Sequence, residues 1–233
     1  MIPVSRSSRF SKVAVAAYFL VAFVEIIAEY FQSQTLIFLT KPLLMPILMF
    51  IYWKASVKKN KLFVFALMIV WVGNLFFIYK TFPFITIGSI LFSVFRAIMI
   101  YLLVKMIRMP GTFPIILGCL PFLFLYLFAI NLTYDELGSR FYTFSIQGIL
   151  SVVFSGIALG SYIFKPDKAS MYLVTSAMFF AFTQFLFLIK LFYLSVDVFQ
   201  PLSIVLFVGA QFLLCKFMVA QENLSMSENQ STR

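Results

Sequence analysis

Residues 12–31, KVAVAAYFLVAFVEIIAEYF, and residues 35–53, TLIFLTKPLLMPILMFIYW, decide the fold of this chain. Each is an apolar run of about 20 residues, the length that an α-helix needs to cross the ~30 Å hydrocarbon core of a bilayer. Such runs predict helices, because backbone polar groups cannot stay unpaired in lipid. Both runs nevertheless carry charge, since Glu25, Glu29 and Lys41 lie inside them. They predict two adjacent membrane spans that face a polar interior.

Six further apolar runs follow, so the sequence predicts an all-α bundle of eight transmembrane helices. The eight predicted spans are residues 12–31, 35–53, 62–79, 84–104, 113–130, 141–164, 169–190 and 199–219. Only 11% of the residues are charged and 63% are hydrophobic, whereas about a quarter of a soluble domain is charged. We expect one transmembrane domain over residues 1–220, its longest outer loop over residues 131–140, and a polar, disordered tail over residues 221–233.

The distribution of basic residues predicts the orientation of the bundle. Of the 18 Lys and Arg residues, Lys80, Arg140 and Lys190 fall at one end, and Lys41 and Arg96 fall inside spans. The other thirteen fall at the opposite end, together with both termini. Because Lys and Arg accumulate in cytoplasmic loops, we expect cytoplasmic N- and C-termini. The bias fits a bacterial cytoplasmic membrane or an endoplasmic reticulum membrane, and the bacterial membrane is our first expectation.

Other features argue against several protein classes. The net charge of +10 lies mainly in short segments between apolar runs, which is typical of orientation signals and not of nucleic-acid binding. Basic residues 1–12 resemble the start of a signal peptide, but no small-residue cleavage site follows, so we expect a retained first helix. Cys119 and Cys215 lie in apolar runs without CxxC spacing, and we expect no disulfide. The chain has no histidine, and we expect no metal and no cofactor.

Polar side chains gather in the middle and the predicted outer half of the spans. At ~1.5 Å of rise per residue, Glu25 and Lys41 both lie ~9 Å below the outer boundary on adjacent antiparallel helices. We therefore expect them to form an ion pair, with Glu29 one turn above Glu25 on the same face. We also expect a pocket that opens toward the outer leaflet. Its predicted lining is Glu25, Lys41, Asn74, Arg96, Gln147, Gln184 and Gln211, with Thr183 beside it.

Each of these residues also has a structural alternative. A charge at the bilayer centre costs at least ~2.5–3.5 kcal/mol, but Lys41 can snorkel to the interface. The buried amides can form interhelical hydrogen bonds that contribute about 0.6 kcal/mol each. Arg96 is too deep to reach water, so it needs Glu25, backbone carbonyl groups or a wet cavity. Pro42 and Pro46 predict either a cavity wall beside Lys41 or an ordinary bent helix.

At these same residues the chain resembles the YhhN-like family, the lysoplasmalogenases, which are eight-span membrane proteins. The resemblance covers most of the chain and rests on five short segments in order. They are Lys41-Pro42, Gly73-Asn74, Gly88 with Phe92 and Arg96, Ser176 with Phe180, Thr183 and Gln184, and Ala210-Gln211. The chain departs from the family at three positions. Asn74 and Gln184 stand where the family has aspartate, and Arg96 stands where it has histidine.

The resemblance implies hydrolysis of the vinyl-ether bond of lysoplasmalogens, which gives a fatty aldehyde and a glycerophospho-headgroup. This chemistry needs a proton for the vinyl ether and a water for the resulting oxocarbenium-like carbon. An amide cannot exchange a proton near neutral pH, and arginine keeps its proton. The first hypothesis is therefore a lipid-binding member with weak, altered or lost hydrolase activity. In it, Arg96 and Lys41 hold the phosphate of a lysophospholipid or ether lysolipid.

Two other hypotheses remain open. In the second, the protein is a working hydrolase in which Glu25 supplies the proton and Lys41 tunes it, because a buried glutamate can serve as a general acid. In the third, the protein is a small transporter, although the polar residues do not continue through the inner half of the spans. All three place the chain in a membrane, and the first two give it a membrane lipid as its partner.

Overall fold

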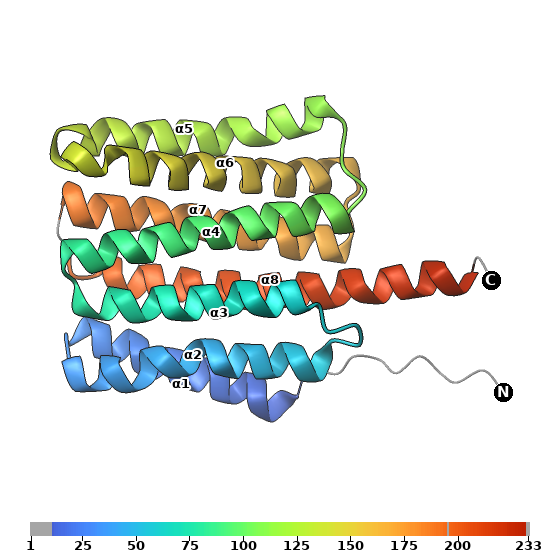
Figure 1. Ribbon diagram of the computed structural model, residues 1–233, viewed down its shortest axis with the longest axis horizontal. Coiled ribbons are helices and arrows are strands. Elements are labelled where there is room, and N and C mark those ends of the chain that lie inside the picture. Colours follow the sequence, from blue (N-terminus) through green and yellow to red (C-terminus); the bar gives the residue numbers. More distant parts are fainter. Residues whose placement is uncertain (1–10, 195, 232–233) are drawn as a thin grey trace.

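The computed structural model describes residues 11–194 and 196–231. These residues form eight long α-helices and two single-turn 3-10 helices, η1 (Phe77–Tyr79) and η2 (Gly138–Arg140), and they contain no strand. The long helices run side by side along one axis (Figure 1). They are α1 (Lys12–Tyr30), α2 (Gln34–Ala55), α3 (Lys61–Phe76), α4 (Phe82–Met106), α5 (Thr112–Leu137), α6 (Phe141–Phe164), α7 (Lys168–Phe192) and α8 (Phe199–Ser231).

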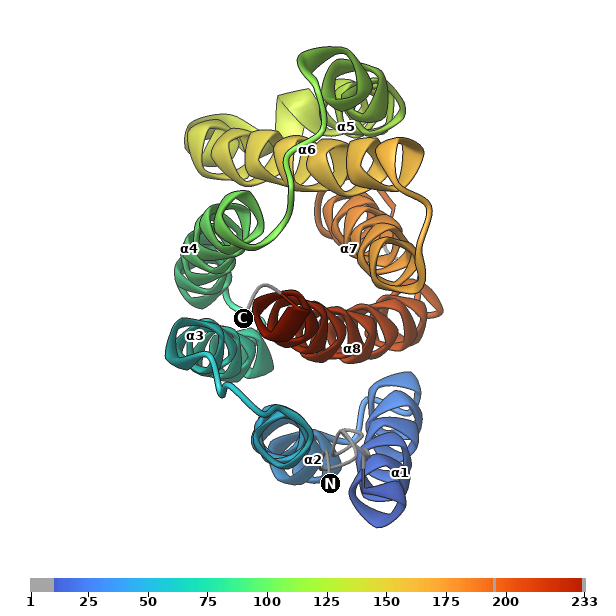
Figure 2. The ribbon, with the colours of Figure 1, turned by 90° about the vertical axis from the view of Figure 1, so that its right-hand side faces the viewer.

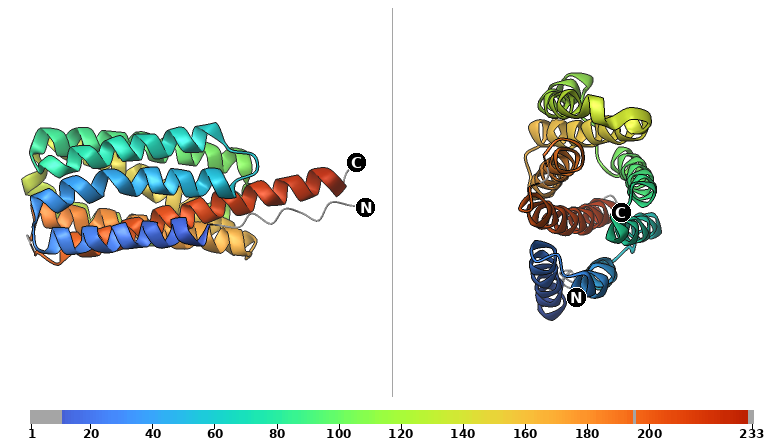
Figure 3. Two further views of the ribbon diagram at one scale, coloured as in Figure 1. Left: turned by 90° about the horizontal axis from the view of Figure 1, so that it is seen from below. Right: turned by 90° about the vertical axis from the view of Figure 1, so that its left-hand side faces the viewer.

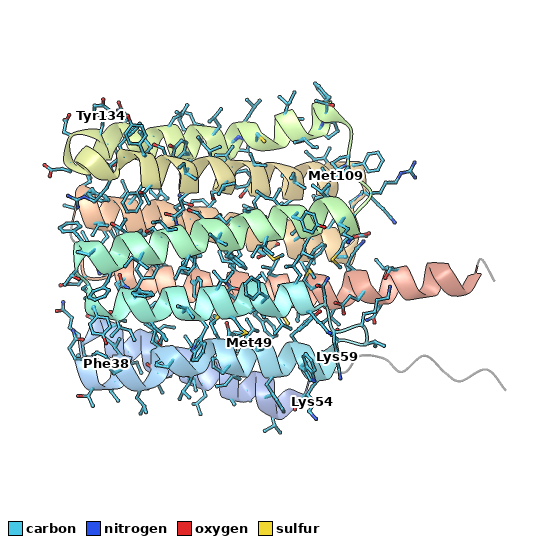
Figure 4. All side chains as sticks on the ribbon, viewed as in Figure 1. Phe38, Met49, Lys54, Lys59, Met109 and Tyr134 are labelled. Atoms are coloured by element: carbon cyan, nitrogen blue, oxygen red, sulfur yellow. The ribbon has the colours of Figure 1, made fainter. Side chains whose placement is uncertain are left out.

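All eight helices contain a stretch that is long and apolar enough to cross a membrane, α3 being taken together with η1. This result confirms the predicted all-α, eight-span class, and by the length and composition of its helices the chain is an integral multi-pass membrane protein. The beginning of α1 and the end of α8 lie at the same end of the bundle, on the right in Figure 1. We call this the terminal end, and the opposite end the far end. Lys54 and Lys59 mark the terminal end, and Tyr134 marks the far end (Figure 4).

Two predicted segments differ from the structure. Helix α5 continues to Leu137, through most of the loop predicted over residues 131–140, and it ends before Gly138, whose φ is +50°. Buried Leu137 continues the apolar face of this helix. Helix α8 continues to Ser231, so residues 221–231 are helical where the sequence analysis expects a polar tail, and residues 232–233 lie outside the described part. The polar composition of this stretch hid a buried residue, Glu222.

Glu222 explains why α8 extends past its apolar part. Its carboxylate accepts hydrogen bonds from the hydroxyl groups of Tyr52 and Ser56, at the end of α2. The Tyr52 hydroxyl in turn accepts a hydrogen bond from the backbone N–H of Asn60, which caps the beginning of α3. A buried carboxylate with such partners is satisfied. The contacts therefore attach the end of α8 to the connection between α2 and α3.

Two prolines lie inside α2, and the helix continues through both of them. Pro46 has no N–H, so the carbonyl group of Pro42 loses its normal helical partner four residues later. The indole Nε1 of Trp71, on α3, donates a hydrogen bond to this carbonyl at 2.9 Å. A neighbouring helix thus satisfies the group that proline left unpaired, as is required where water is excluded.

Seven helices form a closed ring. Each packs against the next in the order α1, α2, α3, α4, α6, α7, α8, and α8 packs against α1 again. Helix α2 also contacts α8 across the ring, and α5 lies outside it, against α6 and α7. Figure 2 and the right-hand view of Figure 3 show this arrangement along the helix axes. Any site inside the ring is therefore built from seven helices and not from α5.

Candidate functional site

A chamber of about 270 Å³ lies inside the ring. All seven ring helices contribute to its lining, and α5 contributes nothing. Most of its polar residues lie in the parts of the helices nearest the far end, Arg96 lies deeper, near the middle of α4, and Lys80, Lys190 and Gln200 lie beside the helix ends themselves. The side chain of Lys80 is 42% exposed, so the chamber has its mouth at the far end. The polar pocket expected from the sequence is present as a cavity.

The structure brings most of the residues predicted for the site together. Seven of the eight line the chamber: Glu25, Lys41, Asn74, Arg96, Gln147, Thr183 and Gln184. Gln211 does not, although it is fully buried on α8. Phe207 lines the chamber on α8, and its ring lies 5.8 Å from that of Phe92 and 6.3 Å from that of Phe180, centroid to centroid. Gln211 lies one turn of α8 beyond Phe207, farther from the far end.

The ion pair predicted between Glu25 and Lys41 is present, but Glu29 is the nearer partner. Lys41 Nζ lies 2.7 Å from Glu29 Oε1 and 3.7 Å from Glu25 Oε1. Glu29 Oε2 also accepts a hydrogen bond from Lys80 Nζ at 3.3 Å. The side chains of Lys41, Glu25 and Glu29 are all almost completely buried. Lys41 therefore does not snorkel, and its charge is compensated inside the bundle.

Glu25 keeps one oxygen atom free. Its Oε1 faces Lys41, whereas its Oε2 is buried and has no hydrogen-bond partner in the described structure. Glu25 is also the only carboxylate in the lining of the chamber within residues 11–194 and 196–231. The site thus offers a single carboxyl group with an uncommitted oxygen.

Arg96 has no such compensation. Its Nη1 donates a hydrogen bond to Ser151 Oγ at 2.7 Å, and its guanidinium lies over the ring of Phe180 at 5.5 Å. Its Nε has no partner, and no carboxylate of the described residues lies within 4.0 Å of it. The structural pair with Glu25, considered from the sequence, is therefore absent. The side chain is buried on α4 and lines the chamber, so a full positive charge faces the cavity.

The amide side chains of the lining are also incompletely paired. The side-chain carbonyl oxygens of Gln147, on α6, and Gln184, on α7, are buried without a hydrogen-bond partner. Neither oxygen therefore forms the interhelical hydrogen bond that was the structural alternative for these residues. Buried polar atoms without partners are uncommon in folded proteins, and here they belong to two side chains that line a cavity of about 270 Å³.

Sequence reasoning missed four polar residues of the lining: Lys80, Lys190, Gln200 and Ser203. Lys190 Nζ donates a hydrogen bond to Gln200 Oε1 at 3.0 Å. The sequence places Lys80 just after one predicted span and Lys190 as the last residue of another, so both lysines entered the prediction only as orientation signals. A helical pattern was nevertheless visible, because Gln200, Ser203 and Phe207 recur at the spacing of one helix face.

No protein-family model, no curated protein and no solved structure matches this chain. Within residues 11–194 and 196–231, no group of three or more His, Cys, Asp or Glu side chains is placed to hold a metal ion. The fold and the site together define a class of protein. It is an α-helical membrane protein with a buried chamber that has aromatic walls and cationic groups.

Proposed function

We propose that this membrane protein binds a single-chain phospholipid, a lysophospholipid or an ether lysolipid, in the chamber, and that its hydrolase activity toward such lipids is weak or lost. One observation carries the proposal: the guanidinium of Arg96 faces the cavity without an anionic partner. A buried charge is costly unless it is paired. An anionic group of the ligand supplies the missing partner.

A phosphate group suits this position. Arginine presents planar N–H donors that match phosphate oxygens, and hydrogen bonds between ionised groups are the strong ones. Nε of Arg96 is free to donate. The sequence hypothesis gave Lys41 an equal share in holding the phosphate, but Lys41 already contacts Glu29 and Glu25. We therefore assign the phosphate to Arg96 alone.

The apolar part of the lining suits an alkyl or alkenyl chain. Five phenylalanine side chains share the chamber with the polar groups: Phe77, Phe92, Phe180, Phe187 and Phe207. Because the chain of a membrane lipid is already out of water, its gain in the chamber comes from van der Waals packing against these rings. A ligand with one phosphate and one hydrocarbon chain therefore fits both kinds of wall.

Weak or absent hydrolysis follows from the groups that line the chamber. Asn74, Gln184 and Arg96, the three residues that replace the family's acids and histidine, all line it. Amides do not exchange protons near neutral pH and arginine keeps its proton. Glu25 is then the single carboxyl group among the described lining residues, and the lining holds no second carboxylate and no histidine to activate water.

The test is lipid retention by the purified protein. We expect mass spectrometry to find a single-chain phospholipid with the wild-type protein in mild detergent, and to find it lost from Arg96→Ala. Arg108→Ala is the matched control. It removes the same charge as Arg96→Ala, but from an exposed position at the terminal end. Equal retention by the wild type and Arg96→Ala would contradict the proposal.

A second function, a working hydrolase, is favoured by the free Oε2 of Glu25. In this mechanism the Glu25 carboxyl group protonates the outer vinyl carbon. Water adds to the oxocarbenium carbon and returns a proton to Glu25, and the hemiacetal then breaks into aldehyde and alcohol. The wild type should release fatty aldehyde from lysoplasmalogen, Glu25→Gln should abolish the release, and Asn74→Ala should retain it. No aldehyde from the wild type would exclude this function.

A further inference from the structure

The chamber carries more positive charge than its carboxylates neutralise. Four cations line it: Lys41, Lys80, Arg96 and Lys190. Within the described residues, two carboxylates form ion pairs with them: Glu25 in the lining and Glu29 behind Lys41 and Lys80. A third carboxylate, that of Asp197, acts electrostatically on Lys190 from outside the lining. With all three ionised, four positive and three negative charges leave a net charge of +1. No carboxylate of the described residues lies within 4.0 Å of Arg96 or of Lys190.

These two cations lie at different depths. Lys190 lies two residues before the end of α7, and its bonded partner, Gln200, lies one residue after the beginning of α8. Both therefore lie within one helical turn of the far end. Ser151, the partner of Arg96, lies ten residues into α6, or ~15 Å from that end. Arg96 thus belongs to the deep part of the chamber, and Lys190 belongs to its mouth.

Lys80 completes the mouth. It lies in the turn between η1 and α4 with a φ of +50°, and its contact with Glu29 directs its ammonium group toward the chamber. Glu29 is shared between Lys80 and Lys41, so one carboxylate serves two lysines. Any part of a ligand that extends from Arg96 toward the mouth approaches two ammonium groups, from Lys80 and Lys190.

We infer that Lys80 and Lys190 select lysolipids whose headgroup is negatively charged over those with a choline or ethanolamine headgroup. The inference rests on the proposed function, in which Arg96 holds the phosphate. A cationic headgroup placed at this mouth meets like charges, and such repulsion is an effective source of specificity. An anionic or neutral polar headgroup meets N–H donors and positive charge instead.

The test compares two lysolipids with the same oleoyl chain, lysophosphatidylglycerol and lysophosphatidylcholine, by titration of the delipidated protein in detergent. The wild type should bind lysophosphatidylglycerol at least about tenfold more tightly than lysophosphatidylcholine. A tenfold difference is what one charge-assisted hydrogen bond contributes. Lys80→Gln with Lys190→Gln should reduce this preference to about twofold or less by removing the repulsion and the attraction together. Equal binding of the two lipids by the wild type would overturn the inference.

Controls separate the possible causes. Lys54→Gln with Lys105→Gln removes two exposed lysines at the terminal end and should keep the preference. Lys80→Arg with Lys190→Arg keeps the charges and should also keep the preference. This variant guards against a folding defect in the glutamine variant.

The outcomes for the wild type distinguish the inference from the proposed function. If the wild type binds neither lipid, the proposed function fails together with the inference. If it binds both lipids equally, only the inference fails. Displacement of the lipid by chain-free glycerophosphoglycerol at equal concentration would overturn a lipid as the ligand.

Discussion

Lys41 and Arg96 are both cations in one buried chamber, and they differ in what neutralises them. Lys41 lies between Glu25 and Glu29, whereas Arg96 has a serine and an aromatic ring as its neighbours. A buried ion pair holds its position, because removing one partner leaves an uncompensated charge. Of these two cations, Lys41 is neutralised within the bundle, and Arg96 is the one without a carboxylate partner among the described residues.

Glu29 provides the sharpest test of this difference. Glu29→Gln removes the nearer partner of Lys41 and the partner of Lys80 while it keeps the size of the side chain. We expect the free energy of unfolding to fall by ~3 kcal/mol, measured by denaturant titration in mixed micelles. Glu136→Gln, at an exposed position near the end of α5, should change it by less than about 0.5 kcal/mol. A similar, small change in both variants would show that the buried pair does not stabilise the fold.

The sequence predicted part of this arrangement. Counting residues from the predicted turn between two antiparallel spans places Glu25 and Lys41 at the same depth in the membrane. This prediction requires no side-chain information. The choice between Glu25 and Glu29 as the nearer partner depends on the rotation of each helix about its axis. The short α1–α2 connection, in which Gln32 has a φ of +53°, sets that rotation. Single-sequence patterns do not determine it.

Helix α5 is held against the ring by close packing of small residues. A Cβ atom added to Gly118 would lie 2.6 Å from the backbone oxygen of Gly156, and one added to Gly160 would lie 2.9 Å from the backbone oxygen of Pro114. Close approach of backbones through small residues is the usual way in which membrane helices associate, because lipid gives no hydrophobic driving force. These glycines therefore position the one helix that does not line the chamber.

Substitution at this contact should separate stability from binding. Gly118→Ala places a methyl group against backbone atoms that cannot rotate away, so we expect a loss of about 1–3 kcal/mol in unfolding free energy. Gly111→Ala is the control, because its added Cβ would meet only ordinary contact at 3.8 Å. Lipid retention, measured by mass spectrometry, should persist in both variants because α5 lies outside the ring. Loss of the lipid with Gly118→Ala alone would contradict the independence of α5 from the chamber.

Helix identity was predictable here, whereas helix ends were less so. Hydropathy and length identified all eight spans, because apolar runs of this length have few alternatives in lipid. The same criterion ended α5 and α8 too early, since polar residues near a membrane surface are compatible with helix and with loop. Burial of Glu222 against Tyr52 and Ser56 decides the matter for α8. In the sequence, Glu222 is 170 positions from Tyr52 and 166 positions from Ser56. A local sequence pattern does not extend over such separations.

At the scale of the whole molecule, the ring explains why scattered polar residues meet. Residues from seven helices line one chamber, although no two of the helices that carry Glu25, Arg96 and Gln184 are neighbours in sequence. The sequence predicted their convergence from a shared depth in the membrane. It could not predict that α5 is left out or that Gln211 is not part of the lining, because both depend on how the helices pack against one another.

The orientation of the bundle is still a prediction from the charge bias, and it can be tested directly. In a variant without Cys119 and Cys215, a single cysteine is introduced either at exposed Val57, at the terminal end, or at exposed Asp135, at the far end. A membrane-impermeant maleimide applied to intact cells should label Asp135→Cys at once and Val57→Cys only after permeabilisation. The reverse pattern would place the mouth of the chamber on the cytoplasmic side.

The contact of Lys41 with Glu25 and Glu29 has a consequence for biogenesis. The chamber cannot close until α8, the last of these eight helices in chain order, reaches α1. The first helices therefore enter the bilayer before most of their neighbours are made. A lone first helix with two ionised glutamates would enter lipid at a high cost, but the second helix brings a cation to the same depth. The amino-terminal hairpin is therefore suited to leave the translocon as one unit, with most of its intramembrane charge already matched.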